Sequence, residues 1–271
     1  MSEPTWVLES EVFADGHAGL RAAIRARGGR IVDWRDSWLR GGATARGGVP
    51  PSLGEGAVVF HGSLANAARV GEELGWTPGG FYVPGAFRCS RYYPSAAPWL
   101  AQRAWTTSTV RELVADARSV AARVGARESI FVRPDSPLKP FSGRVLGVGA
   151  IDRPALDYGF YYDEDTLPVI VAAPLELGRE FRFVVVDRTV VAGAAYLPDG
   201  RRADASSVDP GARRLAAEVA ASLPPPAPAY VLDVCARGDD YRLLELNPFG
   251  GADLYGCAPE AIVAAIARLL P

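Results

Sequence analysis

The amino acids YVLDVCARGDDYRLLELNPF occupy residues 230–249 and predict a β-hairpin. Aliphatic side chains recur at 230–236 and 242–246, and runs of this kind favour β-strands. Between the runs, Gly238, Asp239 and Asp240 are typical of a turn. We therefore expect two antiparallel strands that are joined by a short loop.

The register of this hairpin decides which side chains share a face. If Arg237 pairs with Tyr241 across a three-residue loop, Asp233 lies directly opposite Glu245. Side chains alternate between the two faces of a strand, so Asn247 joins the two carboxylates. Facing carboxylates repel each other unless a cation lies between them, and a set of oxygen ligands suits Mg²⁺. The register thus predicts a magnesium site.

The opposite face of the same strand should carry Leu244 and Leu246 into a hydrophobic core. A different interpretation is a surface hairpin whose acidic face is simply solvated. A slip of one residue in the register would move one carboxylate to the other face, and the magnesium site would be lost.

A basic loop follows a predicted strand in the segment IFVRPDSPLKPFSGR, at residues 130–144. It carries Arg133, Lys139 and Arg144, whose charged groups suit phosphate oxygens, and Gly143, which allows a backbone to approach an anion. The loop can therefore cover a nucleotide, and the alternative is a solvated loop. It is not a P-loop, because the spacing GxxxxGK(S/T) does not occur in the sequence.

Glu180 and Arg182 share one face of a predicted strand at 180–186. Such a pair is ordinarily a structural salt bridge. Beside a magnesium triphosphate, Arg182 would instead bind phosphate and Glu180 would hold the guanidinium in place.

The first part of the chain predicts a small α/β lobe with a parallel sheet. A helix at 63–74 begins at the capping residue Ser63 and ends at Gly75. Residues 35–56 are expected to form a loop, and residues 84–106 an irregular connection rich in aromatics and prolines. The remaining elements expected here are strands at 5–8, 30–34 and 57–60 and a helix at 17–27.

The second part of the chain predicts an α+β lobe, because strands and helices are segregated there. A helix at 109–124 should begin with a capping box formed by Thr109 and Glu112. We place the domain boundary between an N-terminal lobe with its connection, 1–106, and a second domain, 107–271. The further elements expected are strands at 129–133, 167–173 and 189–196 and helices at 210–223 and 259–270.

Composition is that of an ordinary globular protein, with 49% hydrophobic and 22% charged residues among 271. A net charge of −2 gives no electrostatic footprint for nucleic acid or for an anionic membrane. Three scattered cysteines indicate a reducing compartment. The sequence has no apolar run of membrane-spanning length, and we expect a cytoplasmic protein. Lys139 is the only lysine beside 28 arginines.

Taken together, these segments resemble the ATP-grasp superfamily, in which two α+β subdomains clasp a nucleotide. The motifs EFRF at 180–183 and LNPFG at 246–250 are similar to a divergent clade. This clade includes the eukaryotic cell-division-cycle protein that helps to assemble a translation initiation factor, and bacterial and phage relatives of unknown role. The resemblance implies an ATP-grasp fold preceded by the small α/β lobe. It departs from the typical pattern at Arg133, where most members use lysine, so Lys139 would supply the ammonium group.

The resemblance also implies a role for each matching position. Residues 132–134 look like the phosphate-binding strand, 141–143 like the flexible glycine loop and 169–175 like the adenine hinge. Asp233, Glu245 and Asn247 would bind Mg²⁺. Catalytic roles would fall to Arg133, Lys139 and Arg182. The residues implied to bind ATP are Arg133, Lys139, Ser142, Gly143, Val171, Ala172, Ala173, Leu175, Glu180 and Arg182.

The implied activity is ligation of a carboxylate to an amine through an acylphosphate, with a small molecule or a peptide as substrate. No side-chain nucleophile is needed, and we expect His17 and His61 to be structural, although His61 at the end of a strand can face a substrate crevice. A second hypothesis is an ATP-binding assembly factor or chaperone for a partner protein, with little turnover. A third is a structural α+β protein, which would show no magnesium-dependent affinity for ATP.

Overall fold

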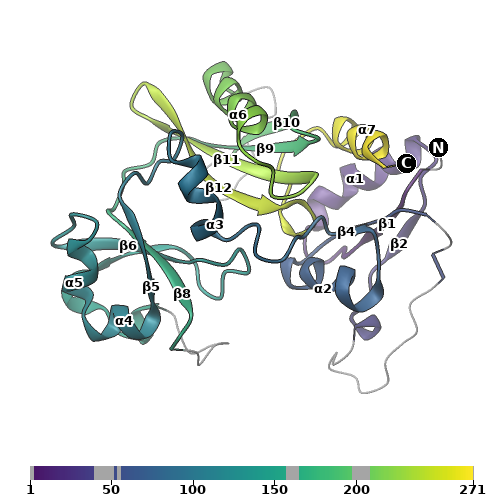
Figure 1. The fold of residues 1–271 in the computed structure, drawn as a ribbon. Coiled ribbons are helices and arrows are strands. Elements are labelled where there is room, and N and C mark those ends of the chain that lie inside the picture. Colours follow the sequence, from purple (N-terminus) through teal and green to yellow (C-terminus); the bar gives the residue numbers. More distant parts are fainter. Residues whose placement is uncertain (1–2, 40–51, 54–55, 157–164, 197–207, 271) are drawn as a thin grey trace.

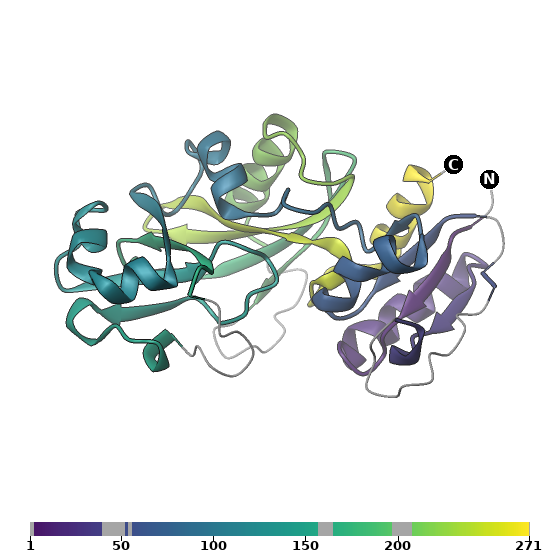
Figure 2. The same cartoon turned by 60° about the horizontal axis from the view of Figure 1, so that its bottom comes forward.

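The computed structural model describes residues 3–39, 52–53, 56–156, 165–196 and 208–270. These residues form three four-stranded sheets, and the central one lies between the other two (Figure 1). The view in Figure 2 shows the same order along the molecule. None of the described helices is long and apolar enough to cross a membrane.

The N-terminal sheet is parallel, as the sequence predicts, with strand order β2-β1-β3-β4. Ser63 Oγ caps its second helix by accepting a hydrogen bond from Asn66 N at 3.3 Å, and Gly75 ends that helix with a left-handed φ of 67°. The loop predicted at 35–56 lies partly outside the described residues. The elements are β1 Thr5–Leu8, α1 Ala14–Ala26, β2 Ile31–Asp33, the 3₁₀ turn Asp36–Trp38, β3 Val58–His61, α2 Leu64–Leu74 and β4 Pro78–Gly79.

The second sheet has the order β5-β8-β6-β7. Its edge strand β7 was not expected, because it follows the basic loop directly. The helix predicted at 109–124 is divided at Asp116, whose φ of −149° leaves the helical region. Asp116 accepts a hydrogen bond from Ser119 N at 3.0 Å and so caps a second helix. The elements are β5 Trp105–Thr109, α4 Val110–Ala115, α5 Ala117–Ala122, β6 Ser129–Pro134, β7 Arg144–Gly147 and β8 Pro168–Ala172.

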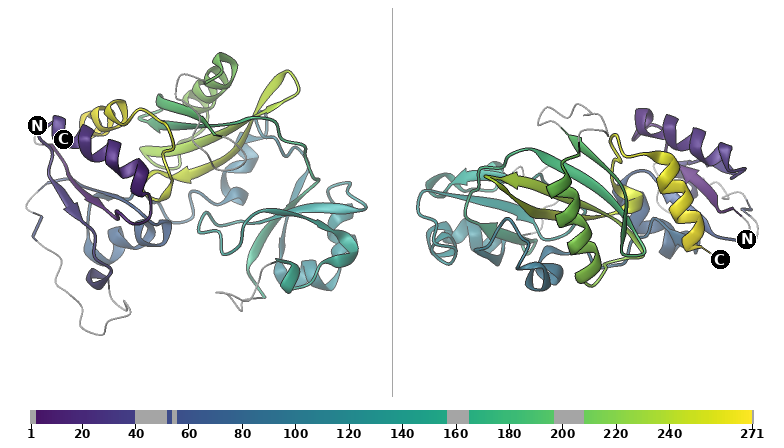
Figure 3. Two further views of the ribbon diagram at one scale, coloured as in Figure 1. Left: turned by 180° about the vertical axis from the view of Figure 1, so that it is seen from behind. Right: turned by 90° about the horizontal axis from the view of Figure 1, so that it is seen from above.

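The central sheet is antiparallel, with the order β10-β9-β11-β12. Helix α6 lies across one of its faces, as the view from above in Figure 3 shows. Large side chains such as Phe183 and Tyr230 are fully buried in this part of the core. The elements are β9 Glu180–Val186, β10 Thr189–Tyr196, α6 Pro210–Ser222, β11 Ala229–Arg237 and β12 Asp240–Pro248.

The hairpin β11-β12 confirms the predicted pairing of Asp233 with Glu245, but not the predicted turn. Arg237 pairs with Asp240 and not with Tyr241, so the loop is one residue shorter than expected. A β-bulge next to Asp233 inserts one extra residue into β12 and restores the register. The bulge turns Leu244 out of the core, where Leu243 is fully buried instead, so the prediction for Leu244 was wrong.

A helix, α3 Cys89–Ala96, lies inside the stretch that was predicted to be irregular. Its first turn is capped by a distant residue, because Asp135 accepts hydrogen bonds from Ser90 N at 2.7 Å and from Ser90 Oγ at 2.8 Å. A buried carboxylate at a helix N-terminus satisfies free N–H groups and complements the helix dipole. The stretch lacks a local capping signal, and this is why the helix was missed.

Two distant helices bring the ends of the chain together. The last helix, α7 Pro259–Leu269, packs against α1 of the N-terminal lobe and against β9 and β10 of the central sheet. Figure 1 shows α7 beside α1, close to both termini. The last helix of the chain therefore helps to hold the N-terminal lobe to the central sheet.

His17 and His61 form a buried pair at this junction. His61 Nε2 lies 3.1 Å from the carbonyl oxygen of Ala252 and must donate to it, so His61 Nδ1 accepts from His17 Nε2 at 2.9 Å. The two rings are 2% and 1% exposed. His61 therefore contacts another part of the fold, and the pair is structural, as expected from the sequence.

Acid should destabilise the protein through this pair. Burial lowers the pKa of His17 to about 4 and that of His61 to about 3, from 6.5. Below pH 6.5 the unfolded chain binds protons that the folded protein does not, so the stability from the pair is lost as the pH falls toward 4. Between about pH 7 and about pH 4.5, we expect the thermal midpoint of the wild type to fall at least about 5 °C further than that of a His17→Leu, His61→Leu variant.

Circular dichroism measures both midpoints, and Glu180→Gln is the control. Burial raises the pKa of Glu180 to about 7, so this carboxyl group favours the folded state at low pH. Its removal should enlarge the acid-induced loss instead of reducing it. An equal fall in midpoint for the wild type and the double-histidine variant would contradict the prediction.

Candidate functional site

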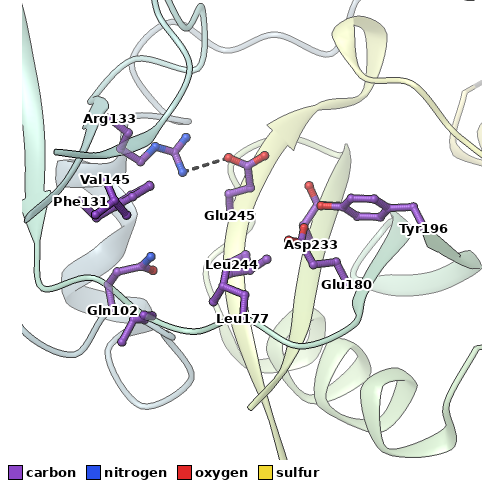
Figure 4. A pocket seen from close by; sticks show the side chains of 11 residues that line it. Gln102, Phe131, Arg133, Val145, Leu177, Glu180, Tyr196, Asp233, Leu244 and Glu245 are labelled. Carbon is purple, nitrogen blue, oxygen red and sulfur yellow. Dashed lines mark ion pairs between the residues drawn. The ribbon is translucent and has the colours of Figure 1, made fainter. Parts of the chain in front are cut away.

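A pocket of about 180 Å³ lies between the central sheet and the second sheet. Figure 4 shows Arg133 beside Phe131 and Val145 on one side of it, and Asp233, Glu180 and Tyr196 on the other. The segment between β8 and β9 contributes to its wall. The lining residues are Gln102, Phe131, Arg133, Val145, Leu175, Leu177, Glu180, Tyr196, Asp233, Leu244 and Glu245.

Glu245 joins the two sheets across this pocket. Its Oε2 lies 2.9 Å from Arg133 Nη1 on β6, and its Oε1 lies 2.8 Å from Lys139 Nζ on the loop after β6. Burial alone would raise the pKa of Glu245, but the positive charges of Arg133 and Lys139 outweigh burial and hold this pKa well below its usual range. The carboxylate is therefore ionised at neutral pH.

Asp233 and Arg182 form a second ion pair, deeper in the site. Arg182 donates from Nε and Nη2 to the two carboxylate oxygens of Asp233 at 2.8 and 2.7 Å. Burial raises the pKa of Asp233, but two guanidinium hydrogen bonds favour the ionised form, and we take the pair to be ionised because its geometry is bidentate. Arg182 also donates to the carbonyl oxygen of Asp253 at 2.7 Å and lies over the ring of Tyr255.

The partner of Arg182 differs from the one expected. Because β9 pairs with β11, Arg182 lies directly opposite Asp233, and Glu180 lies opposite Cys235. The guanidinium is thus held by Asp233 across the strands and not by Glu180 along its own strand. Glu180 lines the pocket instead, where burial, followed by the nearby charges of Asp233 and Glu245, raises its pKa to about 7.

Asn247 connects the two carboxylates. Its Nδ2 donates to Asp233 Oδ2 at 3.2 Å and to Glu245 Oε1 at 2.9 Å. The three predicted metal ligands therefore lie together, but the amide nitrogen of Asn247 faces the carboxylates. A ligand role for Asn247 would require the amide to turn so that its oxygen faces inward.

The predicted glycine loop lies beside β6. Gly143 packs closely against Phe131, because a Cβ atom at Gly143 would lie 2.8 Å from Cζ of that ring. Ser142 is exposed, and its carbonyl oxygen accepts a hydrogen bond from Arg144 Nε at 3.3 Å. Arg144 also donates to Ala155 O at 3.3 Å, so it does not join Arg133 and Lys139 at the carboxylates.

The predicted hinge is only partly in the pocket wall. Val171 and Ala172 belong to β8, a strand that is paired on both sides, and their side chains are fully buried in the core. Ala173 is half-buried just beyond this strand, and the side chain of Leu175 lines the pocket.

Several lining residues were missed in the sequence. Phe131 could have been found, since it lies two residues before Arg133 on the same strand and therefore on the same face. Leu244 was assigned to the core because the bulge was not foreseen. Gln102 and Tyr196 lie far from the motifs, and the sequence offers no signal that they reach the site.

The donor set suits Mg²⁺ bound together with phosphate. Among the described residues, no cluster of three or more His, Cys, Asp or Glu side chains could hold a metal ion by itself. Magnesium commonly binds one or two protein carboxylates, with phosphate oxygens and water completing its six ligands. Glu245 and Asp233 fit that pattern, with Arg133, Lys139 and Arg182 beside them for phosphate charge.

Known structures share this architecture over nearly the whole chain. A RimK domain protein ATP-grasp from Sphaerobacter thermophilus DSM 20745 has a TM-score of 0.64 at 15% identity, covering 98% of this chain and 99% of that one. The ATP-grasp ligase PsnB complexed with minimal precursor has a TM-score of 0.58 at 17% identity, covering 99% and 100%. D-alanine–D-alanine ligase from Bacillus anthracis has a TM-score of 0.53 at 13% identity, covering 99% and 95%.

Identities this low establish the fold alone, and no curated protein sequence matches the chain. A family model does match most of it, from residue 54 to residue 266, and its description is ATP-grasp domain, R-two-K clade family 3. The resemblance inferred from the motifs at 180–183 and 246–250 is therefore confirmed. The chain belongs to family 3 of the R-two-K clade of ATP-grasp domains.

Proposed function

We propose that the protein is an ATP- and magnesium-dependent ligase that joins a carboxylate to an amine through an acylphosphate. The observation that carries this proposal is the contact of Glu245 with both Arg133 and Lys139. Glu245 and Arg133 come from opposite sheets, and both line the pocket. Members of the ATP-grasp superfamily are mostly ATP-dependent ligases, which supports the reaction type.

Each charged residue has a role in this proposal. Asp233 and Glu245 would hold Mg²⁺, which would neutralise phosphate charge when bound. Arg133 and Lys139 would exchange their contact with Glu245 for contacts with phosphate oxygens. Arg182 would stabilise negative charge that develops during phosphoryl transfer while Asp233 keeps its guanidinium in place.

The proposed chemistry needs no nucleophilic side chain. A carboxylate oxygen of the substrate attacks the γ-phosphorus of ATP, the bond to the bridging oxygen breaks, and ADP leaves. The amine nitrogen then attacks the acyl carbon, phosphate leaves, and the nitrogen loses a proton. Glu180 lines the pocket with a pKa of about 7, so it can accept a proton near neutral pH.

The substrate in this proposal is a small molecule or a peptide with a carboxylate. PsnB is complexed with a precursor peptide in one structure, and the Bacillus anthracis relative is a D-alanine–D-alanine ligase. We also propose a cytoplasmic location, in line with the three buried, unpaired cysteines. Phosphate release on addition of acid and amine would distinguish a ligase from an assembly factor with little turnover.

Neutralising Glu245 should remove the effect of magnesium on ATP binding. Glu245→Gln keeps the shape of the side chain but loses its charge. Glu245 is chosen because it is less buried than Asp233, and neutralising Asp233 would leave Arg182 unpaired in the interior. In calorimetry, magnesium should improve ATP affinity about tenfold or more in the wild type but hardly at all in the variant.

The matched control is Glu73→Gln, which removes a carboxylate from a salt bridge with Arg69 on α2, outside the pocket. This variant should keep the full magnesium effect. If Glu245→Gln also keeps it, Glu245 does not bind the metal.

The single lysine permits a chemical test of the loop. An amine-directed acylating reagent should modify only Lys139 and the N-terminus, because no other lysine exists. Magnesium ATP should slow the labelling of Lys139, since its ammonium group would then bind phosphate. Mass spectrometry gives both labelling rates, and the N-terminal amine is the internal control.

A solvated Lys139 would be labelled at the same rate with and without nucleotide, and this result would remove it from the proposed site. Protection by ADP as strong as that by ATP would assign its ammonium group to the α- or β-phosphate instead of the γ-phosphate.

A further inference from the structure

A hollow of about 270 Å³ lies beside the turn of the β11-β12 hairpin, outside the pocket described above. Its lining residues are Arg103, Arg237, Asp240 and Arg242. Arg103 lies on the segment between α3 and β5, whereas the other three residues lie on the hairpin. The fold therefore brings three guanidinium groups from two distant segments of the chain to one hollow.

The positive charge of this hollow is only partly balanced by the chain itself. Arg242 Nη2 lies 3.1 Å from Asp240 Oδ2. Arg103 and Arg237, in contrast, have no carboxylate partner among the described residues, although exposed arginines elsewhere, such as Arg27, do have one. Three guanidinium groups and one carboxylate leave two positive charges, and these repel each other until an anion lies between them.

Two of the three guanidinium groups are already held by the backbone. Arg237 Nη1 donates to the carbonyl oxygen of Ala101 at 3.2 Å, and Arg242 Nη1 donates to that of Tyr241 at 3.2 Å. Each guanidinium group has five N–H donors, so both groups keep several donors for a ligand. Donors that are held in place lose less conformational freedom on binding than free side chains do. The hollow is thus prepared for an anion.

The hollow is close to the pocket but distinct from it. Asp233 of the pocket and Arg237 of the hollow lie on the same face of β11, four residues apart, and this spacing separates their backbones by roughly 13 Å. The hollow and the pocket can therefore be occupied at the same time.

We propose that this hollow binds a phosphate group, at a site separate from the reaction proposed above. A phosphate group carries about two negative charges near neutral pH, which matches the two positive charges of the hollow. Its oxygens can also accept hydrogen bonds from several guanidinium groups at once. A single carboxylate carries one charge and two oxygens, so it would leave part of the positive charge unbalanced.

The phosphate group comes from one of two sources, inorganic phosphate or a phosphate monoester. Arg103 and Arg237 are exposed, so the hollow is open to solvent and the organic part of an ester can extend outward. The recognised chemistry is the same in both cases, and the two sources are separated by experiment.

An arginine-directed dicarbonyl reagent tests the site, with mass spectrometry giving the labelling rate at each arginine of the full-length chain. Inorganic phosphate at ten times its dissociation constant should slow the labelling of Arg103 and Arg237 about tenfold. Arg118, an exposed arginine on α5 that does not line the hollow, should keep its rate. Equal protection by glycerol phosphate would identify the monoester group as the ligand, and protection by inorganic phosphate alone would identify the free ion.

Two substitutions should change the affinity for phosphate in opposite directions. Arg103→Gln removes one exposed guanidinium group, and phosphate should then protect Arg237 with about tenfold lower affinity. Asp240→Asn removes the negative charge from the hollow and should raise the affinity. The matched control Arg118→Gln should leave it unchanged.

Equal protection by acetate at the same ionic strength would overturn the proposal, because it would show screening by salt and not recognition of phosphate. An affinity for phosphate that Arg103→Gln leaves unchanged would overturn it as well. These outcomes do not bear on the proposed ligase activity, which is tested separately by phosphate release.

Discussion

The carboxylate of Glu245 lies on the central sheet, while the two cations that it contacts, Arg133 and Lys139, belong to the second sheet and its loop. The pocket exists between these sheets, so this contact spans the space that a ligand would enter. Charge pairs across a partly buried gap are strong because little water screens them. Arg133 and the basic loop therefore meet the central sheet at one carboxylate.

A second layer of charge lies beneath that contact. Asp233 and Arg182 are almost completely buried and bind each other through two hydrogen bonds. Removing one member would leave a buried charge unpaired, which is far more costly than losing an exposed salt bridge. The deep pair thus gives the site a fixed electrostatic base, whereas Glu245 and its partner Lys139 are more exposed.

Segments far apart in the chain support both layers. Asp135 caps α3, and Tyr92 on that helix accepts a hydrogen bond from Leu246 N at 3.2 Å, next to Glu245. Just beyond the end of β12, His61 contacts the backbone at Ala252, close to the residue whose carbonyl oxygen binds Arg182. The N-terminal lobe and α3 are therefore built into the surroundings of the site.

Local signals in the sequence determined most strands and helices, the caps at Ser63 and Thr109, and the facing positions of Asp233 and Glu245. Such features depend on side-chain periodicity and on hydrogen bonds between near neighbours. The pairing of the carboxylates was nevertheless predicted through two errors that cancel each other. The turn is one residue shorter than predicted, and the bulge that inserts one residue into β12 was not foreseen. Only the tertiary structure decided that α3 is a helix, because the carboxylate of Asp135 that caps it lies on a distant segment. In the same way, Gln102 reaches the pocket only when the two sheets pack together, because the other lining residues lie on separate segments.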